Sequence, residues 1–171
     1  MTISEVEEKF DKLILSLRIC EKNEYIESTL ILLYSMIDSL AWLNSDKEDI
    51  KERQVGKEFE SFTGKYILKY LKYYNITSNE LYNARCGMVH TMMSCSKNKS
   101  IKYIVYANNE NSQKENDKKI KAKGYNAVCI NIFDLLCAVT YAYKDFFEEM
   151  KNNNIKIKKI INKAENYYTI F

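Results

Sequence analysis

The sequence predicts an all-α fold: one domain over residues 1–171, a bundle of five to six helices with a small β-hairpin insert near residues 100–131. The chain contains no proline and only four glycines, so few positions can stop a helix. Hydrophobic residues make up 46% of the sequence and aromatic residues 13%, which is typical of a globular protein. Apolar residues recur at helical spacing along most of the chain.

Three helices are predicted before residue 75. The first covers about residues 3–21, and its apolar stripe consists of Val6, Phe10, Leu13, Leu17 and Cys20. The second covers about residues 24–44 and is apolar around most of its circumference, which is typical of the most buried helix of a bundle. A charged connector, SDKEDIKERQ, leads to the third helix, over about residues 55–74.

The periodicity changes after the fourth helix. Thr77 and Glu80 fit a capping box that opens this helix, which we expect to run to about Met93. Residues 100–107 and 125–131 are short segments rich in β-branched and aromatic side chains, which predicts two strands. The polar connection between them, NNENSQKENDKKIKAKG, is expected to be a mobile loop, so that the strands form a hairpin laid on the bundle.

Two more helices complete the prediction. Asn131 and Asp134 open a long fifth helix, which the three asparagines at residues 152–154 interrupt. Its inward stripe consists of Ile132, Leu136, Val139, Tyr143, Phe146 and Met150. Residues 155–168 form a short basic helix.

Charge and cysteine content narrow the function classes. The net charge of +3 is modest, but residues 97–123 and 151–163 are rich in lysine, which suits either a polyanionic partner or simple solubility. One histidine and five cysteines without a CxxC pair favour neither a metal site nor a disulfide framework, and no cofactor is expected. The acidic start MTISEVEEKF lacks an apolar leader, and the apolar runs are shorter than a membrane span, so we expect a cytoplasmic protein without membrane partners.

The segment LYNARCGMVHTMM, residues 81–93, holds the sole histidine, His90, and one of only three arginines, Arg85. Residues 85–90 read R-x4-H and resemble the R-x4-6-H signature of the HEPN superfamily. The words YSMIDSLAWL and LYNARCGMVHT are similar to those of bacterial HEPN-like proteins, and the resemblance covers about residues 25–95. It implies a HEPN-like helical bundle that cleaves RNA without a metal where two protomers meet. It also implies a toxin or phage-defence role under the restraint of an inhibitory protein partner.

The chemistry of the two residues supports this hypothesis independently. Imidazole suits proton transfer because its ordinary pKa of about 6.5 leaves both forms accessible near neutral pH. Guanidinium can bond two phosphate oxygens at once. We therefore assign His90 as general acid/base and Arg85 as phosphate ligand, with a 2′,3′-cyclic phosphate and a 5′-hydroxyl as products. One imidazole cannot easily be acid and base in a single step, so we expect a homodimer through the fourth helix that supplies a second one.

Helix geometry limits how these residues meet. Arg85 and His90 lie about 140° apart on the helix, whereas Asn83 and Cys86 share the side of His90. We expect Asn83, Cys86 and Asp38, an acid of the second helix, to support the site. In the HEPN family the residue after the arginine is commonly polar. Cys86 departs from that pattern, and a thiol is a poor hydrogen-bond donor.

Other readings of the same residues stay open. A HEPN-like module without turnover could bind RNA, a nucleotide or a protein partner, and a structural protein could bury Arg85 against Asp38 as an ion pair. The tyrosines of KYILKYLKYY could stack on bases or fill the core. Seven lysines could follow an RNA backbone or simply be solvated; they are Lys97, Lys99, Lys102, Lys118, Lys119, Lys121 and Lys123.

Overall fold

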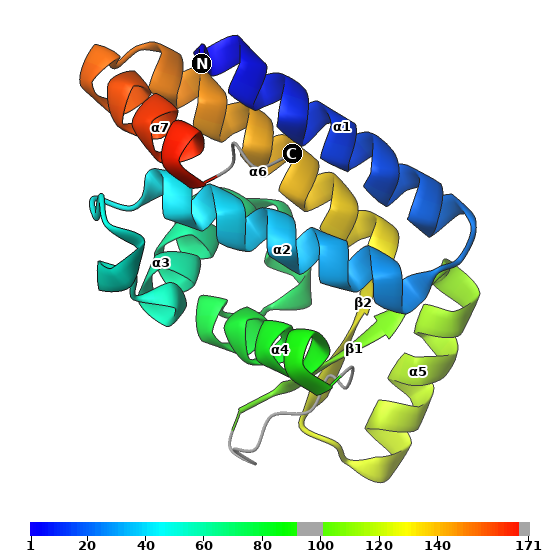
Figure 1. Ribbon diagram of the computed structural model, residues 1–171. Coiled ribbons are helices and arrows are strands. Elements are labelled where there is room, and N and C mark those ends of the chain that lie inside the picture. The colour runs from blue at the N-terminus through cyan, green and yellow to red at the C-terminus, as the bar shows by residue number, and fades with distance from the viewer. Residues whose placement is uncertain (92–100, 168–171) are drawn as a thin grey trace.

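Long helices surround one central helix, and a two-stranded sheet lies at one end of the molecule (Figure 1). The computed structural model describes residues 1–91 and 101–167. Its elements are α1 (Ile3–Lys22), α2 (Ile26–Asn44), η1 (Ile50–Glu52), α3 (Val55–Phe62), η2 (Thr63–Ile67), η3 (Leu68–Tyr70), η4 (Lys72–Tyr74), α4 (Ser78–Thr91), β1 (Tyr103–Ala107), α5 (Glu110–Lys123), β2 (Ala127–Asn131), α6 (Ile132–Lys151) and α7 (Asn154–Tyr167). The described chain is mostly helical, so the broad all-α prediction is confirmed.

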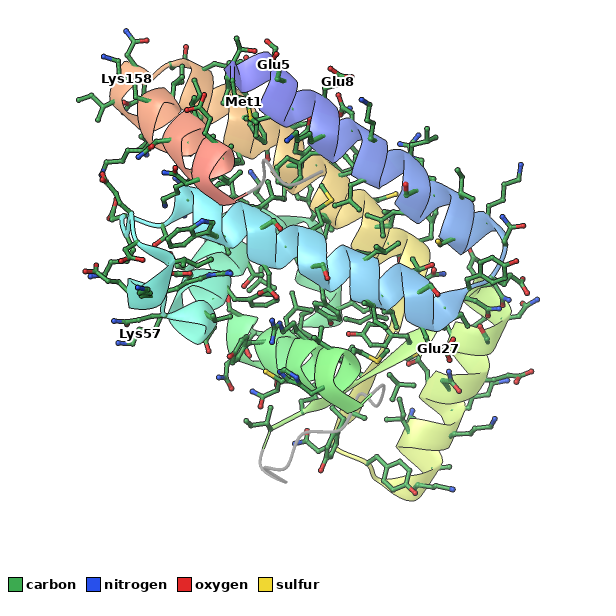
Figure 2. The ribbon with its side chains drawn as sticks, in the orientation of Figure 1. Met1, Glu5, Glu8, Glu27, Lys57 and Lys158 are labelled. Carbon is green, nitrogen blue, oxygen red and sulfur yellow. The ribbon has the colours of Figure 1, made fainter. Side chains whose placement is uncertain are left out.

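Helix α2 is the centre of the bundle. Ten of its residues are buried, and it packs against α1, α3, α4, α6 and α7. Side chains from these neighbours fill the space around it (Figure 2). Its length and mean hydropathy would also suffice to cross a membrane, but a core helix meets the same two criteria, and more than half of its apolar window is buried. The expected burial of this helix is therefore observed, but α6, with eleven buried residues, is enclosed to the same degree.

The two longest helices follow the predicted pattern. In α1, Thr2 and Glu5 form a reciprocal capping box, and Val6, Phe10 and Leu17 are buried. In α6, the Asn131 side chain accepts a hydrogen bond from the Phe133 N–H at 3.0 Å, and all six residues of the predicted stripe are buried. The asparagines after α6 separate it from α7, as expected.

The prediction of one continuous third helix over residues 55–74 is wrong. The α-helix ends at Phe62, and a π-helical turn (η2) and two 3₁₀ turns (η3 and η4) follow. The Thr63 hydroxyl donates to the carbonyl of Phe59 at 2.8 Å, a bond that competes with regular helix geometry. Next to it, a Cβ on Gly64 would lie 3.1 Å from the Ser78 hydroxyl oxygen, so a glycine lets the start of α4 approach closely.

The predicted hairpin is also wrong, although both strands exist. β1 and β2 pair in parallel, with Tyr103 opposite Ala127 and Ala107 opposite Asn131. A parallel pair needs a long crossover connection, and α5 provides it. The insert is therefore a β1-α5-β2 unit, in which α5 packs on both strands.

The connection expected to be a mobile loop is helical because both of its ends carry capping residues. Asn109 accepts a hydrogen bond from the Ser112 N–H at 2.9 Å, and the Ser112 side chain returns a contact to the Asn109 N–H. Gly124 ends the helix in the left-handed conformation that favours glycine. The side chains that are not fully exposed lie toward the sheet and include Gln113, Asn116 and Ile120. They are mostly polar, so the hydrophobic period did not reveal the helix.

Helix α7 is held against the end of α2 by a buried lysine. The Lys163 side chain is 1% exposed, and its ammonium group donates to the carbonyls of Trp42 and Ser45 at 2.8 and 2.5 Å. The same group lies 4.3 Å from the centre of the Trp42 ring, a cation–π contact. Burial lowers the pKa of Lys163 to about 8, and the Glu58 carboxylate opposes that change. Lys163 thus caps α2 with a charge that burial disfavours.

Replacement of Lys163 by methionine should remove part of the pH dependence of stability. Between pH 8 and 10.5 the unfolded chain binds a proton at this lysine that the folded chain has lost, so raising the pH stabilises the wild-type fold. We expect the free energy of unfolding in urea to rise by about 2 kcal/mol from this group between roughly pH 7.5 and 9.5. Lys163→Met should lack that increment, while Lys158→Met, on the exposed face of α7 (Figure 2), should keep it. An equal pH response in all three proteins would contradict the assignment.

Candidate functional site

Helix α4 presents the predicted site residues. The Thr77 and Glu80 side chains each accept a hydrogen bond from the other's backbone N–H, at 3.2 and 2.8 Å, so the predicted capping box is confirmed. The helix packs against α2, α3 and β1, and it lies below α2 in the view of Figure 1. Its expected end at Met93 lies outside the described residues.

The Arg85 side chain turns inward and pairs with Asp38 of α2. Its Nε and Nη2 atoms lie 2.9 and 2.5 Å from Oδ2 of Asp38, and both side chains are 14% exposed. The other carboxylate oxygen of Asp38, Oδ1, is buried and has no hydrogen-bond partner among the described residues. The structure thus brings together two of the predicted site residues, as a largely buried ion pair.

Opposing effects act on this pair. Burial raises the pKa of Asp38, and the hydrogen bond from Arg85 only partly offsets the rise. Burial also disfavours the charge on Arg85, but the Asp38 carboxylate outweighs this effect and raises the pKa of the guanidinium. Arginine remains charged in either case, so the charged form of Asp38 is the one that depends on keeping Arg85 beside it.

A second arginine reaches the same turn of α2, and the sequence analysis missed it. Nη2 of Arg53 donates to the backbone carbonyl of Asp38 at 2.8 Å, and its Nε donates to Glu58 at 2.9 Å. Glu58 also accepts from Ser45, which links this cluster to the end of α2. Of the three arginines in the chain, two therefore converge on Asp38, and no signal in the sequence indicated the part of Arg53.

Tyr82 is another neighbour that the sequence analysis did not identify. Its ring packs on that of Phe59, with centroids 5.5 Å apart, and a Cβ on Gly56 would lie 3.2 Å from it. Burial raises the pKa of Tyr82, and its hydrogen bond with Cys86 adds to the rise. Cys86, which is half-buried, is therefore part of the polar cluster with Arg85 and Tyr82.

His90 lies on the other side of α4. It is exposed, as is the adjacent Val89, whereas Asn83 is half-buried. The Asn83 amide donates to the Asn79 carbonyl at 2.7 Å, one turn earlier in the helix. The outward face of α4 thus carries His90 with Asn83 nearby on the same side, and Arg85 lies on the inward side, as the helical spacing predicted.

Of the seven lysines predicted to bind nucleic acid, the five that the structure describes are divided between the start of β1 and different sides of α5. Lys97 and Lys99 lie outside the described residues. The Lys102 ammonium donates to the Asn75 carbonyl at 2.7 Å and lies 4.0 Å from Glu80, which fixes the start of β1 beside α4. The remaining four are exposed on α5. Lys118 and Lys121 lie about 60° apart on that helix, and Lys119 and Lys123 occupy another side of it.

The tyrosines of KYILKYLKYY bind acids of α6. Tyr66 donates to Glu149 at 2.8 Å, and Tyr70 donates to Asp145 at 2.5 Å. Tyr73 and Tyr74 both donate to Asp134, at 2.7 and 2.6 Å. These bonds account for the tyrosines as contacts between the η2–η4 segment and α6, which favours the structural reading over base stacking.

Among residues 1–91 and 101–167, no three histidine, cysteine or acidic side chains lie close enough together to hold a metal ion. Cys20, Cys86, Cys129 and Cys137 are free thiols. Comparison of the chain with models of known protein families, with curated proteins and with solved structures gives no match. Function must therefore be argued from the residues themselves.

The arrangement divides two chemical capacities between two faces of one helix. His90 is accessible to a molecule that binds the outer face of α4. Arg85 supplies fixed positive charge just beneath, where Asp38 uses two of the five donors of the guanidinium. A phosphate could use the remaining donors only by approaching a side chain that is 14% exposed.

The Asp38–Arg85 contact should dominate the attachment of α4 to α2. We expect Asp38→Asn and Arg85→Gln each to lower the free energy of unfolding by about 2 to 4 kcal/mol, because each leaves a buried polar group without its charged partner. In a double-mutant cycle the coupling energy should exceed about 1 kcal/mol. Urea denaturation measures all four proteins.

The exposed pair of Glu8 and Lys12 on α1 is the matched control, and its cycle should give a coupling energy close to zero. A coupling energy between Asp38 and Arg85 no larger than that of the control pair would show that the buried contact adds nothing to stability.

Proposed function

We propose that this protein is a HEPN-like, metal-independent endoribonuclease that acts as a homodimer through the outer face of α4, in a toxin or phage-defence role. His90 serves as general acid/base, and Arg85 holds the scissile phosphate. Asn83 and Cys86, about two turns and one turn before His90 on α4, support the site, and Asp38 orients the guanidinium.

The observation that carries the proposal is the exposure of His90 on a helix face where residues 78–90 place no exposed charged side chain. Asn79, Asn83, Cys86 and Val89 are uncharged, and the arginine of the same helix is turned inward. An isologous contact between two such faces brings two imidazoles together without bringing like charges together. It supplies the acid and the base that one chain lacks.

Arg85 fits its role through its anchoring. Asp38 already fixes Nε and Nη2 of the guanidinium, so the side chain loses little further conformational freedom when it binds a phosphate. Its remaining donors are therefore oriented in advance.

The main rival is a HEPN-like module that binds RNA, a nucleotide or a partner without cleaving RNA. One observation favours it: the charge of Arg85 is already matched by Asp38, and both side chains are largely buried. In that case Arg85 only fastens α4 to α2, and the outer face of α4 binds without turnover.

Purified protein incubated with mixed single-stranded RNAs in EDTA should yield fragments with 2′,3′-cyclic phosphate and 5′-hydroxyl ends. His90→Gln and Arg85→Gln should each reduce the cleavage rate by about a hundredfold or more, because proton transfer and charge neutralisation are lost. Arg18→Gln, an exposed arginine on α1, is the matched control and should cleave like wild type. RNA binding without cleavage in every preparation would support the rival module.

A mixing experiment tests the need for two imidazoles. Wild type and His90→Gln are refolded together at equal amounts, and mixed dimers then carry one imidazole. If both are required, the rate falls to about a quarter of the wild-type value, the share of dimers with two wild-type chains, rather than to half. A linear dependence on the wild-type fraction, or a monomer in sedimentation velocity at working concentration, would reject the two-imidazole mechanism.

A further inference from the structure

A groove of about 490 Å³ runs between the C-terminal half of α1 and the N-terminal half of α6. Arg18 and Lys22 line it from α1, and Phe133, Tyr141 and Lys144 line it from α6. These two helices lie side by side in Figure 1, on different elements from the α4 face that carries His90. The proposed ribonuclease function does not use this groove.

Large apolar side chains are unusually exposed along the groove. Phe133 and Tyr141 are each 53% exposed, although they belong to the helix with the longest buried stripe. Leu15 is 61% exposed and lies outside the groove lining, but it is on the same side of α1 as Arg18 and Lys22, three and seven residues later. Contiguous exposed apolar side chains with a polar rim are typical of a surface that another molecule covers.

The rim of the groove is cationic and unpaired. Arg18, Lys22 and Lys144 form no ion pair with any residue in the described part of the chain, and Glu21 is the one carboxylate that lines the groove with them. Cations on neighbouring surfaces are paired, for example Lys69 with Asp145. The acids of α1 gather at its other half, where Glu5 and Glu8 extend outward (Figure 2).

These features together select the kind of occupant. Phe133 and Tyr141 lie eight residues apart on α6, which is about 12 Å, or a little over two helical turns. A third helix laid between α1 and α6 would cover that length with apolar residues at i, i+3 or i+4, and i+7. Carboxylates beside those apolar residues would meet the three unpaired cations.

Two other occupants fit less well. A second copy bound symmetrically would set Arg18, Lys22 and Lys144 close to their own counterparts, which is repulsive. Single-stranded RNA would find few free aromatic faces, because the Tyr141 ring already packs on Tyr70 with centroids 5.2 Å apart. RNA bases stack on aromatic side chains, so an RNA strand would also gain little from contact with the aliphatic Leu15.

We propose that the α1/α6 groove is the docking site for an acidic amphipathic helix of a partner protein. The helix places its apolar stripe on Leu15, Phe133 and Tyr141, and its carboxylates pair with Arg18, Lys22 and Lys144. The proposal does not depend on RNA cleavage.

The test uses two fluorescein-labelled, helix-stabilised peptides of about four turns with the same leucine stripe, one flanked by glutamates and the other by lysines. The glutamate peptide should bind wild type saturably in fluorescence anisotropy. Combined Arg18→Glu, Lys22→Glu and Lys144→Glu should weaken it at least about tenfold and transfer preference to the lysine peptide. Combined Leu15→Ser and Phe133→Ser should also weaken it about tenfold or more, because the apolar anchors are lost.

The matched control makes the same charge change elsewhere, with Lys118→Glu, Lys119→Glu and Lys121→Glu on α5, and should bind the glutamate peptide within about twofold of wild type. Circular dichroism checks that every variant is folded. Failure of the glutamate peptide to bind, or equal loss in the α5 control, would overturn the proposal. So would tighter groove-dependent binding of a labelled single-stranded RNA, or conversion of a dimer to a monomer by Leu15→Ser with Phe133→Ser.

Discussion

Helix α2 is apolar around almost its whole circumference, and the rest of the chain is arranged to cover it. Three polar groups that α2 carries inward are bonded by three different neighbours. The Tyr34 hydroxyl bonds that of Tyr106 in β1, Asp38 bonds Arg85 in α4, and the carbonyl of Trp42 accepts from Lys163 in α7. A buried polar group without a partner is costly, so these bonds determine where the sheet, α4 and α7 attach to α2. Apolar contacts are not directional and would not fix these positions along α2 by themselves.

This constraint places stability and chemistry on the same arginine. Arg85 holds α4 against the core through Asp38, and in the proposed ribonuclease it would also bind the scissile phosphate. A side chain with both duties stays rigid, which favours preorganised charge, but it is poorly exposed, which slows the approach of an anion. His90 carries no such double duty: it is exposed and contributes nothing to the core.

The sequence predicted those parts of the fold that depend on hydrophobic period and on capping residues. The stripes of α1 and α6, the burial of α2 and the capping box of α4 all follow from such local signals. The parallel sheet could not be predicted in this way, because α5 has almost no apolar period and its side chains toward the strands are mostly polar. The break after Phe62 was missed for the opposite reason, since the aromatic spacing continued through a stretch where Thr63 and Gly64 end the regular helix.

The candidate site was predictable only as far as residue type allows. The Asp38–Arg85 contact was one of the readings left open, and the structure shows it. The part of Arg53 could not be deduced, because its position depends on how the η1 turn (Ile50–Glu52) brings the connector back to α2. The basic region was also predicted only by residue type. The lysines expected to share one loop are spread around the helix α5, so closeness in sequence does not place them on one surface.

The outer face of α4 and the α1/α6 groove differ in charge. Within residues 78–90, the outer face of α4 carries no exposed charged side chain, and such a face can meet its own copy without repulsion. The α1/α6 groove has three unpaired cations on its rim, and such a surface repels its own copy but attracts an acid-rich partner. The two proposed contacts, a dimer through α4 and a partner helix on α1 and α6, are therefore compatible, because neither contact uses the side chains of the other.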